Sequence, residues 1–459
     1  AVETWEPRFS YKAFRYIEIT GYSGCIESGQ ILIIAAHTQL DCLGRFHCSS
    51  LVLNKIFDAC IRTQKNGILG LMGDCPHREQ AQYLADADLQ METFGYNFQD
   101  RSIPIKVLND FRHAQQEDGT FPFVFPSNTE WPGLDLKIPE WDLHYVSLLW
   151  KTFQLYGDTC ILKEFYPVAK KMIDHYLSKI DRMTGLIPKS GGWHISDWPY
   201  PDVDHEGEYL TVQNCEMYKC LLILGQIARM VGAANEGEAY LQAASGLRGA
   251  IVERMYDKTR KVFMDCLGSR KASQAVNVLA FHYGVVPHGD RTRLLKHIVG
   301  QGMQCSILAS LFLLRTLFEN DEQDRALSIL MSEEYPGWGY MIRSGYQTTW
   351  EGFQDRDSHS HAWSSYPARI LMEYVVGIQP ASPGFDKVNI KPFISPALEY
   401  AEAEVTTIHG SIYAKWYRER SWVHLVVKLP DGIEGTIHMP RGRTIRIDDS
   451  IQRCVVFEA

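Results

Sequence analysis

A long stretch of helical periodicity, from about residue 49 to residue 376, constrains the fold of this 459-residue chain more than any other feature. Apolar residues recur there every three or four positions, as on the buried face of a helix. The pattern predicts about twelve helices, over 49–66, 79–94, 103–117, 139–156, 161–180, 211–231, 236–256, 273–283, 290–298, 307–319, 321–331 and 362–376. No alternating strands separate them, which excludes a βαβ fold.

Helix pairs stacked over this length form either an open solenoid or a closed toroid. A solenoid should show a sequence repeat of roughly 30–45 residues, and we find no convincing repeat. We therefore predict a mainly α protein whose central part is an (α/α)6 toroid, also called a six-hairpin barrel. In such a toroid the loops at one end surround a central cavity, so the loops between long helices are where chemistry is expected.

Patterns typical of β structure flank the helical stretch on both sides. Residues 1–45 are predicted to be an N-terminal β-domain, the end of a larger β-sandwich, because of strand-like runs at 14–19 and 30–36. The toroid then takes 46–379. Residues 380–459 are predicted to be a C-terminal β-sandwich, with strands at 388–390, 404–408, 411–417, 422–428 and 435–439. A chain that opens in this way is expected to be the C-terminal part of a longer protein.

Composition excludes several classes of protein. The net charge of -9 argues against a nucleic-acid partner, because phosphate binding favours a basic surface. No apolar run reaches the ~18 residues of a membrane span, so no membrane partner is expected. The 11 cysteines include no CxxC pair. Neither a disulfide framework nor a zinc site is indicated, and a reducing, cytoplasmic location is expected. The sequence leaves the oligomeric state open, with a homodimer as one alternative.

An acidic segment, residues 74–86, is the first candidate for chemistry. It contains Asp74, Arg78, Glu79 and Asp86. A proline two residues after Asp74 suits a helix that the aspartate caps, and a continuing helix would place Glu79 and Asp86 on one face. Arg78 could hold one carboxylate ionised while another stays protonated, the asymmetry that acid/base chemistry needs. A capped surface helix with incidental salt bridges fits the spacing equally well.

Two further loops combine acids with tryptophans. Around residues 131–142, two tryptophans and three acids surround a helix start, although acids facing the helix dipole would explain the same pattern. Residues 191–200 fit a sugar platform with a hydroxyl acceptor beside it, or a hydrophobic loop plug. The candidate residues of these loops are Trp141, Trp193, Asp197 and Trp198.

A fourth loop, residues 346–363, places Glu351 between a tryptophan and a glycine, upstream of His359 and His361. Trp338 precedes it. Alternate histidines could both reach one metal ion, but the spacing supplies no third ligand, and capping of the next helix by a neighbouring serine is favoured. Motifs of other enzyme classes are absent: there is no GxSxG, no P-loop and no GxGxxG in a βαβ context.

Two carboxylates far apart in sequence, Glu79 and Glu351, each lie among aromatic residues and loops. This suggests glycoside hydrolysis, in which one carboxyl protonates the leaving oxygen and another activates water. Two alternatives remain. One is a different (α/α)6 carbohydrate-active enzyme, such as a polysaccharide lyase with a Tyr or His base and an ultraviolet-absorbing product. The other is a non-catalytic sugar-binding homologue, which a hydrolysis assay would identify.

A series of motifs carries a family resemblance: Phe14-Arg15-Tyr16, Asp74-Cys75-Pro76-His77-Arg78-Glu79 with Asp86, Gly119-Thr120-Phe121-Pro122, Trp193 with Asp197-Trp198, Ser273-Gln274-Ala275, Thr348-Thr349-Trp350-Glu351, His359-Ser360-His361 and Pro383-Gly384-Phe385. Their order and spacing are similar to those of bacterial α-L-rhamnosidases of glycoside hydrolase family 78, over essentially the whole chain. The acidic segment departs from the longer family motif. It lacks one acid, and Tyr83-Leu84 stands near the usual tryptophan, so the fine specificity is in doubt.

The resemblance implies an (α/α)6 catalytic barrel flanked by β-sandwiches, and inverting hydrolysis of terminal, non-reducing α-L-rhamnosyl residues. It implies that Glu79 is the general acid and Glu351 the general base. We expect a partly apolar pocket and nearby acids to raise the pKa of Glu79. No metal or cofactor is required, and the partner is a carbohydrate substrate. The predicted sugar-binding residues are Asp74, Arg78, Asp86, Trp193 and His361, which match the family, together with Trp141, Asp197, Trp198 and Trp338.

Overall fold

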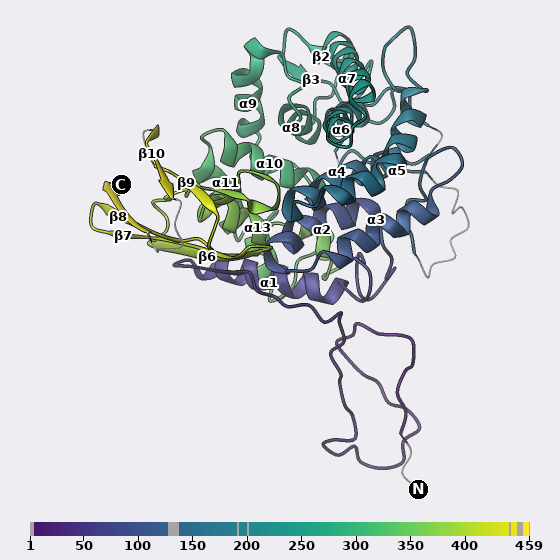
Figure 1. Cartoon of the computed structure of the whole chain (residues 1–459). Helices are drawn as coiled ribbons and strands as arrows, with labels where there is room; N and C mark the ends of the chain where they lie inside the picture. Colours follow the sequence, from purple (N-terminus) through teal and green to yellow (C-terminus); the bar gives the residue numbers. More distant parts are fainter. Residues whose placement is uncertain are drawn as a thin grey trace.

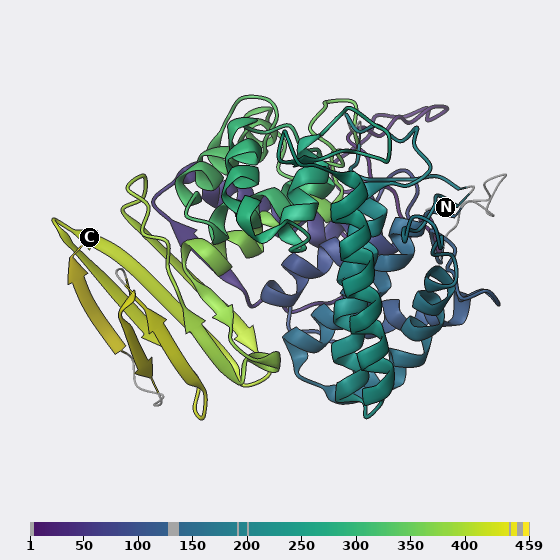
Figure 2. The ribbon, with the colours of Figure 1, turned by 90° about the horizontal axis from the view of Figure 1, so that it is seen from above.

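The computed structural model describes residues 4–126, 137–190, 192–199, 202–439, 442–447 and 453–458. It has a helical body and a β region at the C-terminal end, which lie side by side (Figures 1 and 2). One continuous cluster of buried apolar side chains runs through both. Within the described ranges, no helix combines the length and the apolar character that crossing a membrane would need.

The helical body is a closed ring of helix pairs. α2 contacts α4, α4 contacts α6, α6 contacts α8 and α8 contacts α10, and η2 contacts both α10 and α2 to close the ring. Each inner helix also contacts an outer one. The helices of the described residues are α1 (Leu51–Gly67), α2 (Leu84–Asn97), α3 (Ser102–Ala114), α4 (Pro139–Tyr156), α5 (Thr159–Leu177), α6 (Thr211–Met230), α7 (Ala234–Met255), α8 (Gln274–His282), α9 (Arg291–Gly300), α10 (Ile307–Glu319), α11 (Gln323–Met331), α12 (Trp338–Arg343) and α13 (Pro367–Ile370), with the shorter turns η1 (His288–Asp290), η2 (Ala362–Ser365), η3 (Leu371–Val375) and η4 (Pro383–Phe385).

Sequence explains which helices lie inside. The inner helices α2, α8 and α10 are almost wholly buried, and α8 and α10 are apolar nearly all round, whereas the outer helices α1, α9 and α11 bury one stripe. α2 also buries acids, which other helices neutralise. Several starts are set by a side chain that accepts a backbone N–H: Ser50 for α1, Asp158 for α5 and Ser273 for α8. The predicted (α/α)6 toroid is therefore confirmed.

The helix predicted over 79–94 is wrong at its start, because α2 begins only at Leu84. The Asp74 carboxylate does not cap a first turn, since it accepts the N–H of Ala81, seven residues on, at 2.8 Å. Gln80 has a φ of 52°, in the left-handed region that interrupts a right-handed helix. Glu79 therefore lies in a turn, and it shares no helix face with Asp86.

A buried ion cluster holds the inner ring together. Glu92 on α2 receives Lys151 of α4 at 2.7 Å, Arg315 of α10 at 2.6 Å and Arg369 of α13 at 2.8 Å. Burial alone would raise the pKa of Glu92, but the three cations hold it far below its usual range. Four inner helices thus meet at one carboxylate.

The segment before the helices is extended and largely exposed, and it reaches away from the helical body (Figure 1). The strands predicted at 14–19 and 30–36 do not form. A strand needs a hydrogen-bonded neighbour, and no described residue provides one to either run. The side chains of Leu32, Ile33 and Ile34 are 81%, 67% and 68% exposed. That the segment ends a larger β-sandwich stays a prediction.

The C-terminal region consists of two sheets. One has the order β1-β6-β7-β8-β11 and the other β10-β9-β5-β4, and both contribute to the same core. Every second residue of β6 is buried, as expected for a sheet with one covered face. The strands are β1 (Arg45–Cys48), β4 (Ile378–Pro380), β5 (Lys387–Ile390), β6 (Tyr400–Thr407), β7 (Gly410–Glu419), β8 (Trp422–Lys428), β9 (Glu434–His438), β10 (Thr444–Ile447) and β11 (Arg453–Glu458), and a hairpin of β2 (Tyr256–Asp257) and β3 (Val262–Phe263) lies in the helical body.

The two regions are joined by specific contacts. β1, which precedes the helices, pairs antiparallel with β6 from the other end of the chain. Trp416 of β7 donates its indole N–H to the carbonyl of Val375 at 2.9 Å, and Tyr96 of α2 donates its hydroxyl to Ile378. These contacts hold the sheets against the helical ring.

Candidate active site

A cavity of about 540 Å³ lies where inner helices begin. Its walls come from the turn before α2, the start of α4, and the loops at 193–198 and 351–363. Acids and bases face it together with a group of aromatic side chains, a mixture that suits a polyhydroxylated ligand. The lining residues are Asp74, Arg78, Glu79, Tyr83, Asp86, Phe123, Ile138, Trp141, Trp193, Ile195, Trp198, Glu351, Arg356, Asp357, His361 and Trp363.

Arg78 binds both of the glutamates that the sequence analysis predicts to be catalytic partners, Glu79 and Glu351. Its Nε donates to Glu79 Oε1 at 2.8 Å, and its Nη2 donates to Glu351 Oε2 at 2.8 Å. The two carboxylates come from segments far apart in the sequence and meet at one guanidinium. The contact also holds both groups in the ionised form, since a fixed cation favours carboxylate over carboxylic acid.

Glu351 is fixed on both of its oxygens and by its backbone. Trp198 Nε1 donates to Oε1 at 3.2 Å, and the backbone N–H of Glu351 donates to the carbonyl of Ser358 at 2.8 Å. Gly352 beside it is required, because a Cβ there would lie 2.4 Å from Asp357 and from Pro199. Burial alone would raise the pKa of Glu351, but the charges of His361 and Arg78 lower it. Glu351 is therefore ionised near neutral pH and able to accept a proton.

Asp74 and Glu79 form a coupled pair of carboxyls. Asp74 is 1% exposed, and burial, together with its hydrogen bond to Glu79, raises its pKa to about 7. Burial would also raise the pKa of Glu79, but its hydrogen bonds with Asp74 and Arg78 outweigh burial and lower it to about 2. The expectation of a raised pKa at Glu79 is wrong. Because Arg78 is bound to Glu79 and not to Asp74, the proton of the pair resides on Asp74.

Asp86 and His361 form a buried ion pair deeper in the cavity. His361 Nε2 lies 2.8 Å from Asp86 Oδ1. Burial would lower the pKa of His361, yet the hydrogen bond to Asp86 raises it to about 9, so the ring is a cation near neutral pH. His361 Nδ1 is buried and has no hydrogen-bond partner. Asp74 Oδ2 receives no donor, since Oδ1 takes the N–H of Ala81, and it is the oxygen left to share the proton of the pair with Glu79. His361 Nδ1 is therefore available to a ligand that offers a hydrogen-bond acceptor.

Three of the predicted tryptophans reach the cavity. Trp193 and Trp198 meet edge to face, with centroids 5.1 Å apart and an interplanar angle of 85°. Trp193 is 41% exposed, whereas Trp141, at the start of α4, is buried below it. Such faces pack well against the C–H surface of a sugar ring. The structure thus brings together Asp74, Arg78, Glu79, Asp86, Trp141, Trp193, Trp198, Glu351 and His361.

Two predicted sugar-binding residues lie elsewhere. Asp197 is buried, and it accepts backbone N–H groups of Trp198, Ser306 and Ala309, so it caps α10 rather than facing the cavity. Burial raises its pKa to about 7. Trp338 is also buried, and its indole N–H donates to the carbonyl of Ser364 at 2.9 Å. Both have structural roles, because their polar atoms are already paired.

Two smaller predictions about the same loops also need correction. Neither Ser358 nor Ser360 caps the turn that follows, since η2 has His361 at its N-cap and no side-chain cap bond. His359 does not accompany His361 into the cavity; its ring packs against Tyr346 with centroids 4.1 Å apart and an interplanar angle of 53°. Of the predicted loop segments, residues 131–136, 191 and 200 lie outside the described residues.

Seven lining residues were not among the predicted site residues: Tyr83, Phe123, Ile138, Ile195, Arg356, Asp357 and Trp363. A signal was available for most of them. Tyr83 and Trp363 stand inside segments already selected, and Phe123 follows the Gly-Thr-Phe-Pro motif by one residue. Asp357 is one of two acids, with Asp355, that stand between Glu351 and His361 on the same loop.

Fold and site together have the architecture of a six-hairpin glycosidase domain: a ring of helix pairs with two glutamates in a tryptophan-walled cavity at one end. Comparison with protein families gives the particular group. The chain belongs to the bacterial alpha-L-rhamnosidase family, whose 6 hairpin glycosidase domain matches residues 41–375 and whose C-terminal domain matches residues 377–453. The concanavalin-like domain of the same family matches residues 1–37.

Several relatives are similar over nearly the whole chain. The alpha-L-rhamnosidase of Alteromonas sp. (strain LOR) is 24% identical, over 96% of this chain and 49% of the relative, and that of Streptomyces avermitilis is 25% identical, over 99% and 45%. The solved alpha-L-rhamnosidase of Dictyoglumus thermophilum superposes with a TM-score of 0.89 at 25% identity, covering 99% of this chain and 55% of that one. The chain thus spans about half the length of the curated relatives it matches.

Proposed function

We propose that this chain forms the catalytic part of an α-L-rhamnosidase, which removes terminal, non-reducing α-L-rhamnose from glycosides or oligosaccharides with inversion at the anomeric carbon. The observation that carries the proposal is the meeting of Glu79 and Glu351 at Arg78 in a cavity walled by tryptophans. Membership of the bacterial alpha-L-rhamnosidase family supports the choice of sugar.

In this proposal the proton donor is the Asp74–Glu79 pair rather than Glu79 alone. Glu79 is the more exposed member and reaches the glycosidic oxygen, while Asp74 holds the proton of the pair beneath it. A sugar that binds between Glu79 and Arg78 weakens their ion pair, and the proton then moves along the hydrogen bond to Glu79. The general acid is therefore loaded by its neighbour instead of by a raised pKa of its own.

Glu351 is the proposed general base. Its lowered pKa keeps it ionised, and Trp198 orients one oxygen while Arg78 holds the other. In an inverting reaction it deprotonates a water on the face of the sugar opposite Glu79. The Asp86–His361 ion pair offers a charged hydrogen-bond donor to a ring hydroxyl.

The test is release of rhamnose from an aryl α-L-rhamnoside, with NMR of the first-formed anomer. Glu79→Gln and Glu351→Gln should each lower kcat by about 10²-fold or more, and Glu334→Gln, at an exposed loop away from the cavity, serves as the matched control. Near-normal turnover in either variant would remove that residue from its role. Retention of configuration would refute the inverting mechanism, and an unsaturated product would favour a lyase.

Location and assembly are proposals of the same kind. We propose a cytoplasmic location, which is supported by the eleven free cysteines, and cell fractionation would test it.

A homodimer is the assembly we propose, with sedimentation velocity as the measurement. A single species with the mass of one chain would refute the dimer.

A further inference from the structure

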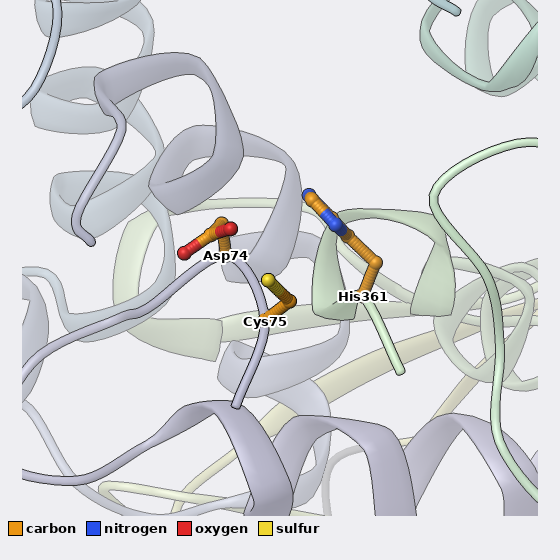
Figure 3. Close-up of side chains that lie close together, drawn as sticks. All are labelled: Asp74, Cys75 and His361. Carbon is orange, nitrogen blue, oxygen red and sulfur yellow. The ribbon is translucent and has the colours of Figure 1, made fainter. Parts of the chain in front are cut away.

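Three buried donor groups that metals favour meet at the inner wall of the cavity. An oxygen of Asp74, the sulfur of Cys75 and a ring nitrogen of His361 all lie within 4.8 Å of one another. Asp74 and Cys75 come from the turn before α2, and His361 comes from the segment that precedes η2 (Figure 3). The sequence alone could not indicate this group, because its ligands come from distant segments and form no metal-binding spacing.

Two of the three donors, His361 and Asp74, are held in place by a partner on their other side. His361 uses Nε2 for Asp86, at 2.8 Å, which leaves Nδ1 buried and without a partner. Asp74 uses Oδ1 for the N–H of Ala81, which leaves Oδ2 without an N–H, O–H or S–H donor. An imidazole oriented by a carboxylate on its outer nitrogen is the common arrangement of a histidine that binds zinc.

We propose that Asp74, Cys75 and His361 form a binding site for Zn²⁺, with Glu79 as the fourth ligand. Glu79 Oε2 already contacts the sulfur of Cys75 at 3.2 Å. Ligand atoms around a tetrahedral zinc lie roughly 3.3–3.7 Å apart, given Zn–S of about 2.3 Å and Zn–N or Zn–O of about 2.0 Å. Small side-chain rotations therefore complete the site. A sulfur, a nitrogen and carboxylate oxygens are a set that Zn²⁺ accepts and that Mg²⁺ and Ca²⁺ do not favour.

Three protons leave when the ion enters. Zn²⁺ displaces the protons on the Cys75 thiol, on His361 Nδ1 and on Asp74, which carries the proton of the Asp74–Glu79 pair, so two positive charges arrive as three leave. All three released protons go to solvent. The Nε2–H bond of His361 to Asp86 is kept throughout, and the thiolate, which burial beside two carboxyls otherwise disfavours, is stabilised by the metal.

Binding there would block the site. The metal takes Asp74, Glu79 and His361, the same side chains that the proposed function uses to load the proton and hold the sugar. Zn²⁺ is thus expected to be a reversible inhibitor that competes with substrate. This consequence rests on the proposed function, whereas binding of the metal itself does not.

Direct binding can be tested with Co²⁺ as a coloured substitute for Zn²⁺. All variants are made in a parent protein, here called the starting chain, that carries Cys25→Ser, Cys160→Ser and Cys454→Ser. These three substitutions remove the exposed thiols. One Co²⁺ should bind and show a sulfur-to-cobalt charge-transfer band, which one equivalent of Zn²⁺ abolishes. Cys75→Ser should remove the band, and Asp86→Asn should weaken binding on the order of 10–100-fold. Cys60→Ser, at a buried cysteine outside the cavity, is the matched control.

The outcomes separate the two proposals. Absence of the band in the starting chain, or its persistence in Cys75→Ser or His361→Gln, overturns the zinc site. Circular dichroism of each variant establishes that it is folded, and Asp86→Asn tests the site without removing any ligand. If Co²⁺ binds as expected but no rhamnoside is hydrolysed even with a chelator present, the zinc site stands and the proposed function falls.

Discussion

Replacing Asp74 by asparagine should make the protein more stable and less active, and the gain in stability should depend on pH. The asparagine side chain keeps the carbonyl oxygen that accepts from Ala81, and its amide can donate to Glu79 as the protonated acid does. What it lacks is the ionised form. The side chain at this position is almost fully buried, so that form is the costly one.

The magnitude follows from the pKa of Asp74, which rises from an ordinary 3.8 to about 7 on folding. A carboxyl with a raised native pKa binds more protons when folded, so folding stability falls as pH rises from about 4 to about 7 and is lowest above that range. The full cost is at most about 4 kcal/mol. About 3 kcal/mol of it should appear between pH 5 and pH 8.

Urea unfolding of wild type and Asp74→Asn at pH 5 and pH 8 measures the effect, with Asp58→Asn, an exposed acid of α1, as the control. The stability difference should grow by about 3 kcal/mol with pH, while kcat falls by about 10²–10⁴ because no proton can be passed to Glu79. Wild-type kcat should itself decline above pH 7. Equal stability differences at both pH values, or full activity in the variant, would refute the assignment of the proton to Asp74.

Three further predictions concern other residues of the barrel. Glu92→Gln should destabilise the fold by about 3–5 kcal/mol in urea titrations, because three buried cations lose their carboxylate; an unchanged midpoint would contradict this. His361→Gln should raise KM for an aryl rhamnoside about tenfold or more, since a charged hydrogen bond is worth about 1.5–3 kcal/mol, and a normal KM would exclude a sugar contact. Trp198→Phe should move the acid limb of the kcat profile to higher pH, because it removes the indole N–H that helps lower the pKa of Glu351; a profile identical to that of wild type would show the bond to be unimportant.

Much of the fold could be predicted from periodicity. The predicted bounds of α4 and α10 coincide with the observed ones, because the apolar periodicity of a helix is set within a few turns of the chain. Prediction failed where a long-range contact decides the backbone. Glu79 lies outside α2 because the carboxylate before it bonds seven residues ahead, and a local pattern shows no such bond.

The site was predicted less completely than the fold. Trp193 and Trp198 stand in a loop and face the cavity, whereas Trp338 begins α12 and its indole N–H is already bound to Ser364. Asp197 looked like a sugar contact beside Trp198, but three backbone N–H groups occupy it. Which face of a loop is turned inward depends on segments that are distant in sequence.

By itself the sequence determined a ring of helix pairs, a strand-rich C-terminal region and, through its family resemblance, two glutamates as partners. Only the tertiary structure decided that one guanidinium joins Glu79 to Glu351, and that the proton belongs to Asp74. The physical reason is that helical periodicity is a local property of the chain. A pKa, in contrast, is set by burial and by charges that folding brings from far along the sequence.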